Sequence, residues 1–278
     1  MGLTLAWLPR RIGYLAAWLA GTLVYILSPG IRAAVADNIK HVLEPGTSED
    51  TLKKTVRIVL INAAKNYFDL IHTPHMTLDD VEHNVTKHGW HHIEDMLKEG
   101  KGVMLFTAHL GSFDMTMHVL PAISAGITIL VEPLEPPLLL RHVTRLREGK
   151  GVSILPVYPG VSKAAVKALR QRKVVLVACD RDVQNDGVAV KFFGEETTLP
   201  VRVIQLAMRA GAAIIPIFNI RRPDGRYDVF IEQPIEISPV KKKASVGDME
   251  RVVSIMEKNI RRYPEQWVVL SRVWGNRR

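Results

Sequence analysis

Short apolar runs recur along the chain from residue 102 onward, and stretches of helical periodicity separate them. The runs at 102–107, 127–131, 152–155, 174–178 and 213–218 have the length and composition of buried strands. Alternation of such strands with amphipathic segments is typical of α/β folds, in which most neighbouring strands are parallel. We therefore predict an α/β fold with a mixed, mostly parallel central sheet flanked by helices.

The segments around this sheet carry clear periodicities as well. Apolar residues recur at three-to-four spacing in 31–43 and 50–71, which predicts a helical layer before the sheet, and 248–262 also looks helical. The stretch 227–237 alternates like an edge strand. Pro216 interrupts the run 213–218 and removes a ladder donor, which favours an edge, a bulge or a shaped backbone near a ligand.

Near the N-terminus, residues 12–27 form a run of sixteen uncharged positions between Arg10-Arg11 and Ser28-Pro29-Gly30. A full membrane span needs about 20 apolar residues, so the run is marginal for crossing and better suited to the bilayer interface. A signal peptide or a buried first helix is the alternative. We expect 1–30 to be a membrane-associating helix, interfacial or single-span, and 31–278 to be one α/β domain. Its aromatic anchors would be Trp7, Tyr14, Trp18 and Tyr25.

The composition is that of a globular protein, with 47% hydrophobic and 23% charged residues among 278. The single cysteine, Cys179, lies in an apolar strand and is expected to be a reduced core thiol. The formal charge of +9 indicates an anionic partner, and a membrane surface is favoured over nucleic acid because no nucleic-acid module is visible. The basic residues near apolar or aromatic segments are Arg10, Arg11, Arg32, Lys241, Lys242, Lys243, Arg261, Arg262, Arg272, Arg277 and Arg278.

The strongest chemical signal is His109-Leu-Gly-Ser-Phe-Asp114, which follows the apolar run 102–107 directly. Active sites of α/β folds gather at the carboxyl ends of strands, and a helix starting near Gly111 would place Asp114 in its first turn. The carboxylate would then orient the imidazole of His109, whose other nitrogen would accept a proton from a hydroxyl. The same spacing from His75 to Asp80 has no apolar strand before it, and we interpret it as a polar loop.

Other polar residues follow predicted strands and are weaker candidates for a binding site. Cys179-Asp180-Arg181-Asp182 follows 174–178, and this segment is either a solvated loop with an internal ion pair or a site where Arg181 binds a phosphate or a polarised carbonyl. Glu132 and Arg147 lie near a strand end and a helix end. No pattern of cysteines and histidines indicates a metal site.

A later motif runs from Val188 through Phe192, Phe193 and Gly194 to Pro200. It combines an alternating strand, two aromatic rings, a turn glycine and a proline suited to the first turn of a helix at 201–209. The two rings are either core residues or the wall of a long apolar slot for a hydrocarbon chain.

In this order the pieces resemble the bacterial lipid A biosynthesis acyltransferases and their relatives, the phosphatidylinositol-mannoside acyltransferases. The match covers most of the chain, and each motif is weak alone, but six in family order make a strong signal. The motifs are the N-terminal apolar helix, Thr107-Ala-His-Leu-Gly-Ser-Phe-Asp114, Asp180-Arg-Asp182, Val190-Lys-Phe-Phe-Gly194 with Leu199-Pro200, Gly211-Ala-Ala-Ile-Ile-Pro216, and Pro264-Glu-Gln-Trp267.

The resemblance implies an O-acyltransferase on the cytoplasmic face of the membrane. His109 would be the general base and Asp114 its orienting acid, while Glu132, Arg147, Asp180 to Asp182 and Phe192 to Gly194 would contact substrate. The donor would be an acyl thioester of coenzyme A or acyl carrier protein, the acceptor a hydroxyl of an anionic glycolipid, and no metal or redox cofactor would take part. Independently of the resemblance, we infer that backbone amides at the start of the helix after Gly111, or a cation such as Arg181, would stabilise the oxyanion.

The chain departs from the family pattern at Ser112 and Phe113, where many relatives have Asn and Trp, and some relatives have Glu at the position of Asp114. The end of the chain lacks an aromatic-His-Arg-Arg tail, so it looks closer to the mannoside branch. Two alternatives remain. One is a glycerophospholipid acyltransferase that uses the same motif on a lysophospholipid, and the other is a basic membrane-surface protein without catalysis.

Overall fold

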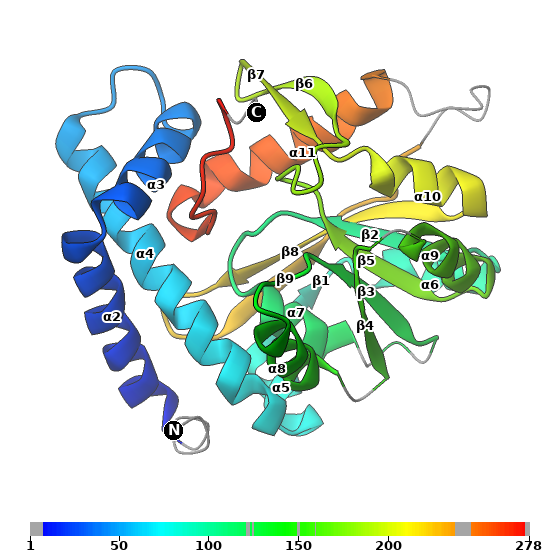
Figure 1. Ribbon diagram of the computed structural model, residues 1–278. Helices are drawn as coiled ribbons and strands as arrows, with labels where there is room; N and C mark the ends of the chain where they lie inside the picture. Colours follow the sequence, from blue (N-terminus) through cyan, green and yellow to red (C-terminus); the bar gives the residue numbers. More distant parts are fainter. Residues whose placement is uncertain are drawn as a thin grey trace.

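The computed structural model describes residues 8–120, 123, 125–148, 151–158, 160–236 and 246–275. Its centre is a seven-stranded sheet with the strand order β1-β9-β8-β2-β5-β3-β4 (Figure 1). Neighbouring strands are parallel except for the β8–β9 pair, so the predicted mixed, mostly parallel sheet is confirmed. The strands are β1 (Val85–His88), β2 (Val103–Thr107), β3 (Ile127–Val131), β4 (Val152–Pro156), β5 (Val174–Ala178), β8 (Ala213–Arg221) and β9 (Tyr227–Ile231).

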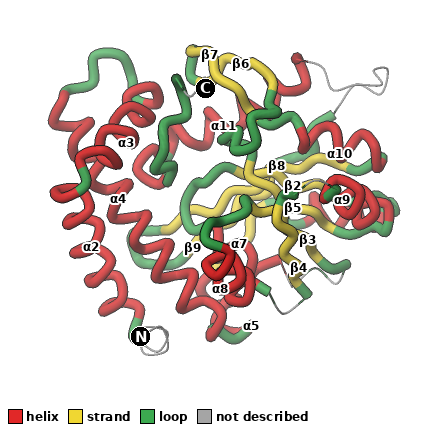
Figure 2. Tube along the Cα trace, in the orientation of Figure 1, coloured by secondary structure: helices red, strands yellow, loops and turns green. Residues whose placement is uncertain are grey.

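Helices cover both faces of the sheet, as the tube view shows (Figure 2). Because side chains alternate along a strand, Met104 and Phe106 of β2 enter one hydrophobic cluster while Val103 and Leu105 enter the other. The longer helices are α2 (Arg10–Leu27), α3 (Pro29–Val42), α4 (Glu49–His72), α8 (Pro137–Arg147), α9 (Val161–Arg170), α10 (Arg202–Ala210) and α11 (Val246–Arg262). The shorter ones are η1 (Thr73–His75), α5 (Leu78–Asn84), α6 (His91–Lys98), α7 (Phe113–Val119) and η3 (Pro264–Gln266).

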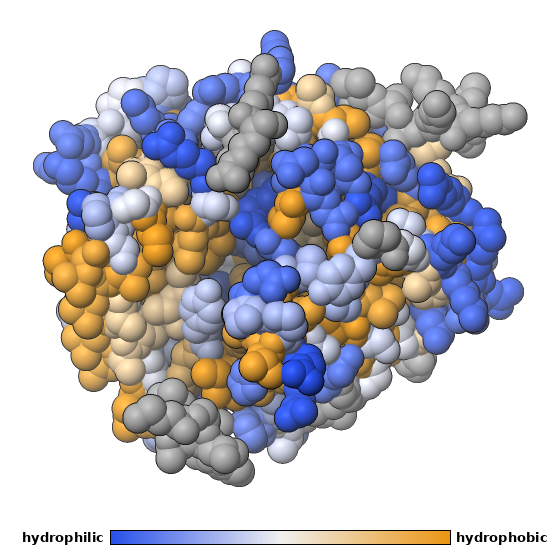
Figure 3. Space-filling view, viewed as in Figure 1, coloured by the Kyte–Doolittle hydropathy of each residue, from blue (hydrophilic) through white to orange (hydrophobic). Residues whose placement is uncertain are grey.

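Helix α2 lies along α4 at the side of the molecule, outside the sheet (Figure 1). Gly13, Ala17 and Gly21 form its buried stripe, and a Cβ on Gly21 would lie only 2.5 Å from the Cα of Ile61. The two backbones approach this closely because glycine has no side chain. The opposite face of α2 is apolar and exposed, and it forms the orange area over α2 in Figure 3.

The length of α2 decides whether this helix could cross a membrane. In the described part of the chain, no helix alone is both long and apolar enough to cross a bilayer, and α2 with α3 passes that test only as a pair bent by 97°. The predicted anchor Tyr14 points inward, because its hydroxyl donates to Asp69 and pairs with Tyr227. Trp18 is exposed, Tyr25 is partly buried, and Trp7 and Lys241 to Lys243 lie outside the described residues.

One prediction about strand position was wrong, and one of the three alternatives for Pro216, the sheet edge, is excluded. The stretch that begins at Tyr227 was expected at the edge, but β9 lies between β1 and β8, and the short, half-polar β1 forms the edge. Pro216 lies in the interior strand β8. The ladder from β8 to β2 ends at Pro216 and the ladder to β9 begins at Ile217, so the missing N–H falls where one ladder gives way to the other.

The motif around the two phenylalanines forms a separate hairpin of β6 (Val188–Phe192) and β7 (Glu195–Leu199). Its two turn residues, Phe193 and Gly194, have φ values of 52° and 84°. Positive φ at both central positions is the requirement of the tightest hairpin turns, so the prediction of a turn glycine is confirmed.

Candidate active site

His109 follows β2 at the carboxyl end of the sheet, close to its middle. Thr107 of β2 is in register with Ala178 of β5, so the residues after both strands lie side by side. The imidazole Nδ1 lies 2.7 Å from Oδ1 of Asp180, and the backbone N–H of His109 donates to Oδ2 at 2.9 Å. Since an ionised carboxylate only accepts, Nδ1 carries the proton and Nε2 is the basic nitrogen.

Asp180 is fully buried and is held by three donors. Besides the two groups of His109, the indole Nε1–H of Trp267 donates to Oδ2 at 2.8 Å. Burial alone would raise the pKa of Asp180, but the charge of His109 and the hydrogen bonds from His109 and Trp267 outweigh burial and lower this pKa to about 2. The carboxylate therefore stays ionised at neutral pH beside the imidazole.

The hydrogen-bond partner of the imidazole is thus Asp180, where the sequence predicted Asp114. Asp114 lies in the first turn of α7 and receives two bonds from Arg147, from Nε at 2.7 Å and from Nη2 at 3.3 Å. The prediction counted residues along one strand and one helix, whereas the register of β2 with β5 delivers a carboxylate from another strand. A role of Asp114 in the reaction stays a prediction.

The loop that carries His109 is fixed by the segment after η3. The N–H of Val268 donates to the carbonyl of His109 at 2.7 Å, and the N–H of Gly111 donates to the carbonyl of Gln266 at 2.9 Å. A side chain at Gly111 would collide with Asn219, whose carbonyl oxygen lies 1.7 Å from the Cβ position. The N–H of Gly111 is used in the bond to Gln266, so an oxyanion donor from the backbone would have to come from the residues after Gly111, as the sequence suggested, and that role stays a prediction.

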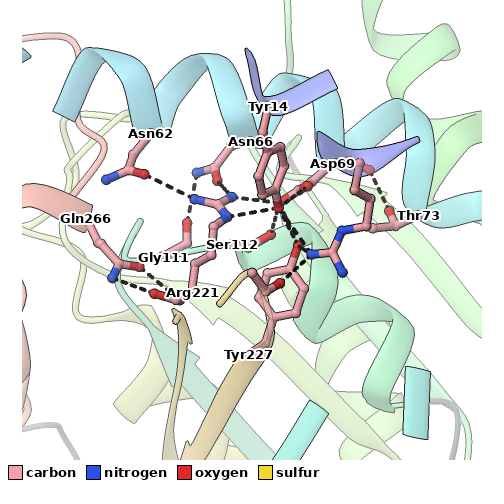
Figure 4. A network of polar contacts seen from close by, with 12 residues as sticks. Tyr14, Asn62, Asn66, Asp69, Thr73, Gly111, Ser112, Arg221, Tyr227 and Gln266 are labelled. Atoms are coloured by element: carbon pink, nitrogen blue, oxygen red, sulfur yellow. Dashed lines mark hydrogen bonds and ion pairs between the residues drawn. The ribbon is translucent and has the colours of Figure 1, made fainter. Parts of the chain in front are cut away.

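A buried polar network lies behind this loop and connects it to α4, β8 and β9 (Figure 4). Oδ2 of Asp69 accepts from Arg221 at 2.6 Å and from Ser112 at 2.7 Å, and Asn66 donates to the carbonyl of Gly111 at 2.8 Å. Burial would lower the pKa of Arg221, but the charge of Asp69 raises it, so the guanidinium stays charged. Burial and the same carboxylate raise the pKa of Tyr227.

The sequence did not predict this network, because its members come from elements spread along the whole chain and match no short motif. Within it, Gln266 binds the backbone of Arg221 through both its amide oxygen and its amide nitrogen (Figure 4). Gln266 and Trp267 belong to the quoted motif Pro264-Glu-Gln-Trp267, which was the only available signal for them.

A pocket of about 470 Å³ opens beside His109, between α4, α7, α8 and the sheet. Its charged lining includes Asp114 with Arg147 and Glu132 with Arg181. The rest is mostly apolar, and three lining residues, Leu176, Ile129 and Ile154, occupy one register row across β5, β3 and β4. Adjacent strands lie about 4.8 Å apart, so this row leads stepwise from the strand next to His109 toward the sheet edge.

The remaining predicted site residues lie in two places. Arg181 pairs with Glu132 and donates to Ser271 Oγ at 3.1 Å, and both members of the pair line the pocket. Asp182 also lines the pocket, where its carboxylate accepts the N–H groups of Asp186 and Gly187 and shapes that loop. By contrast, Phe192, Phe193 and Gly194 do not line this pocket, and the two rings pack in the core against Trp267 and Trp274.

Two other sequence candidates have structural explanations. His75 ends η1, and Asp80 forms a capping box with Thr77 at the start of α5, so the segment is helical rather than the predicted loop. Cys179 is a buried free thiol, as predicted, and burial raises its pKa far above neutrality. Among the described residues, no group of three or more histidines, cysteines or carboxylates could hold a metal ion.

Three relatives with assigned names are similar to this chain. The phosphatidylinositol mannoside acyltransferase of Mycolicibacterium smegmatis is 28% identical over 66% of the chain, and the protein of that name from Mycobacterium tuberculosis is 30% identical over 67%. The lipid A biosynthesis lauroyltransferase of Escherichia coli is 29% identical over 68%. The matches cover 60%, 58% and 61% of these relatives, so the chain spans about three fifths of their length.

One similar solved structure is the 1-acyl-sn-glycerophosphate (LPA) acyltransferase PlsC from Thermotoga maritima, with 13% identity and a TM-score of 0.41 over 93% of this chain and 99% of that one. The family model described as bacterial lipid A biosynthesis acyltransferase matches residues 1–276. This match covers nearly the entire sequence, with the His109 loop, the Asp180 segment and the Trp267 segment inside it. The chain therefore belongs to the bacterial lipid A biosynthesis acyltransferase family.

Proposed function

We propose that this protein is an O-acyltransferase that moves a fatty acyl group from a thioester to a hydroxyl of an anionic glycolipid. The observation that carries the proposal is the His109–Asp180 pair, placed beside a mostly apolar pocket. Such a pair supplies a general base, and the pocket supplies the long apolar surface that an acyl chain needs. Coenzyme A and acyl carrier protein are both suitable thioester carriers.

In the proposed reaction, Nε2 of His109 removes the proton of the acceptor hydroxyl as its oxygen attacks the thioester carbonyl carbon. The tetrahedral intermediate collapses, the carbon–sulfur bond breaks, and the leaving thiolate takes the proton back from His109. Asp180 stabilises the imidazolium between these steps, because its carboxylate is ionised and bonded to Nδ1. No oxidant or reductant is needed for this transfer.

The charged residues around the pocket are proposed to bind the polar parts of the substrates. Arg181 lies beside the pocket and carries a guanidinium that can stabilise the oxyanion of the tetrahedral intermediate. Arg147 and Asp114 face the same space from α8 and α7. We assign these three residues, with Glu132 and Asp182, to substrate contacts, whereas Phe192, Phe193 and Gly194 are better explained as core and turn residues.

The row of Leu176, Ile129 and Ile154 is proposed to form the floor of the acyl slot. In this arrangement the carbonyl of the thioester lies near His109 and the chain extends across the strands, so that Ile154 on the edge strand β4 contacts its far end. The neighbouring residue Leu155 does not line the pocket and packs against the other hydrophobic cluster.

Replacing Ile154 by phenylalanine is expected to shorten the acyl chain that the protein accepts. The larger ring fills the end of the slot, so kcat/KM for the longest donors falls roughly tenfold relative to the shortest, the size expected when a few methylenes lose their place in a pocket. A series of acyl-coenzyme A donors of increasing length measures this ratio. Leu155→Phe is the matched control. An equal change of the kcat/KM ratio in both variants would show that Ile154 does not contact the end of the acyl chain.

We also propose that α2 binds the protein to the cytoplasmic face of the membrane, where thioester donors are available. Its exposed stripe contains Leu15, Leu19 and Leu23, each more than half exposed, and the formal charge of +9 favours anionic lipid. The buried stripe of glycines and alanine leaves this apolar face outward, so the proposal of an interfacial helix for 1–30 is supported by the packing of α2 on α4.

The triple replacement of Leu15, Leu19 and Leu23 by serine is expected to weaken binding to anionic phospholipid vesicles by at least about tenfold, because three exposed apolar side chains no longer enter the bilayer. Co-sedimentation with vesicles measures the change, and the thermal unfolding midpoint shows whether the fold is kept. Unchanged sedimentation of the folded variant would show that α2 does not bind the membrane.

The acceptor is proposed to be a mannosylated phosphatidylinositol or a lipid A precursor, because the similar relatives carry these substrates in their names. Competition tests this assignment. The protein is incubated with acyl-coenzyme A or acyl carrier thioester and an equal mixture of phosphatidylinositol mannosides, lipid A precursor and lysophosphatidate, and the labelled products are identified by mass spectrometry. Faster labelling of the lysophosphatidate would overturn the glycolipid assignment, and no label with any donor would favour a non-catalytic membrane protein.

A further inference from the structure

Trp267 makes a direct contact with the carboxylate on which the proposed mechanism depends. Its indole Nε1–H donates to Oδ2 of Asp180 at 2.8 Å, while Oδ1 of the same carboxylate faces Nδ1 of His109. We propose that Trp267 is a positioning residue, which fixes the orientation of the Asp180 carboxylate and thereby the tautomer of His109. This inference rests on the proposed function of the His109–Asp180 pair.

The backbone around Trp267 is held in place by the loop that carries His109. Trp267 forms an antiparallel bridge with Leu110, and the flanking residues exchange backbone hydrogen bonds with His109 and Gly111. Residues 266–268 therefore bind the loop that carries His109 through their backbone, and they bind the Asp180 carboxylate through the Trp267 side chain.

The packing of Trp267 does not itself require an indole N–H at this position. Trp267 and Trp274 belong to one buried aromatic cluster with Phe192 and Phe193, and both tryptophans are nearly inaccessible. Yet Nε1 of Trp274 has no hydrogen-bond partner within the described residues. The cluster thus contains one indole that binds a carboxylate and one that does not, which makes Trp274 a matched control.

The carboxylate would behave differently without the indole donor. Oδ2 of Asp180 would keep only the backbone N–H of His109, and a fully buried carboxylate depends on each of its donors. Burial, the largest influence on the pKa of Asp180, raises it, and the bond from Trp267 is among the contacts that lower it. Loss of this bond therefore favours rotation or protonation of Asp180, and either change loosens its hold on Nδ1.

The test compares Trp267→Phe with Trp274→Phe in the full-length protein, using palmitoyl-coenzyme A as the donor and phosphatidylinositol mannosides as the acceptor. We expect Trp267→Phe to lower kcat about tenfold with little change in KM for the donor, since a charge-assisted hydrogen bond is lost but no substrate contact changes. Trp274→Phe should keep kcat within about twofold, because among the described residues its indole N–H has no acceptor to lose.

Nitrogen NMR of the imidazole supplies a readout that a purely structural role would not change. In the wild type and in Trp274→Phe, the proton of the neutral His109 ring should lie on Nδ1, whereas Trp267→Phe should show a mixture of the two tautomers. Equal kcat values and the same tautomer in the two phenylalanine variants would overturn the inference, as would a Trp267→Phe protein that is merely less stable.

A second measurement covers the case in which Trp267→Phe does not fold. In the folded protein, the indole proton of Trp267 should resonate downfield of that of Trp274, and Asp180→Asn should move the Trp267 signal alone. An unchanged Trp267 signal would refute the contact. Full activity in both Asp180→Asn and His109→Ala would instead overturn the proposed function, and that result is distinct from a failure confined to Trp267.

Discussion

Replacing His109 by alanine is expected to abolish acyl transfer, with a loss of about 10³-fold or more in kcat, the upper part of the range for a general base. Among the described residues, His109 is the imidazole that both lines the pocket and has its Nδ1–H bonded to a carboxylate. Without it, the acceptor hydroxyl keeps its proton and attacks the thioester poorly. Transfer of labelled acyl chains from acyl-coenzyme A to the glycolipid acceptor measures the effect.

The fold is expected to survive this change, because the imidazole side chain is 29% exposed and the loop is held by backbone bonds of His109 and Gly111 that alanine leaves intact. Vesicle binding should match the wild type, and the unfolding midpoint should fall by a few degrees only, because Asp180 loses one of its three donors but keeps the other two. His75→Ala is the matched control, since its spacing to Asp80 is the same but it lies in η1 and does not line the pocket. Transfer by folded His109→Ala at the wild-type rate would end the proposed mechanism.

Much of the architecture was predictable because the central strands are buried on both faces. A strand such as Val174–Ala178 then reads as a continuous apolar run, and the sequence shows it directly. The strand Val85–His88 was not predicted, because it is short, lies at the sheet edge and includes the polar residues Thr86 and Lys87. Apolar runs in the sequence therefore identify the interior strands of this sheet but do not identify its edge strand β1.

The candidate site was predictable only in part, for a related reason. The position of His109 follows from the strand before it, which is local information. Its bond to Asp180 depends on the order β2-β5 in the sheet, and no pattern in the sequence states which strands are neighbours. Asp69 and Arg221 are 152 residues apart in the sequence, so their ion pair likewise depends on how the elements are arranged in the fold.

Asp180→Asn is expected to lower kcat roughly 10³- to 10⁴-fold, the loss seen when the tautomer of a catalytic histidine is reversed. The asparagine amide can donate to Nδ1, which moves the ring proton to Nε2 and removes the basic nitrogen that faces the hydroxyl. Asp114→Asn is the matched control, because Asp114 binds Arg147 and not His109. We expect it to lower kcat less than about tenfold while weakening substrate binding through the freed Arg147.

The pH dependence of stability gives a second test of Asp180. The pKa of Asp180 is lowered to about 2 in the folded protein, below the ordinary value of 3.8, so its ionised form stabilises the fold. This contribution is complete above the ordinary pKa and is lost as the pH falls from about 4 through about 2. Acid unfolding followed by circular dichroism should therefore lose this dependence in Asp180→Asn. If Asp114→Asn instead removes both transfer and the acid transition, Asp114 rather than Asp180 orients the base, and the motif spacing was the better guide.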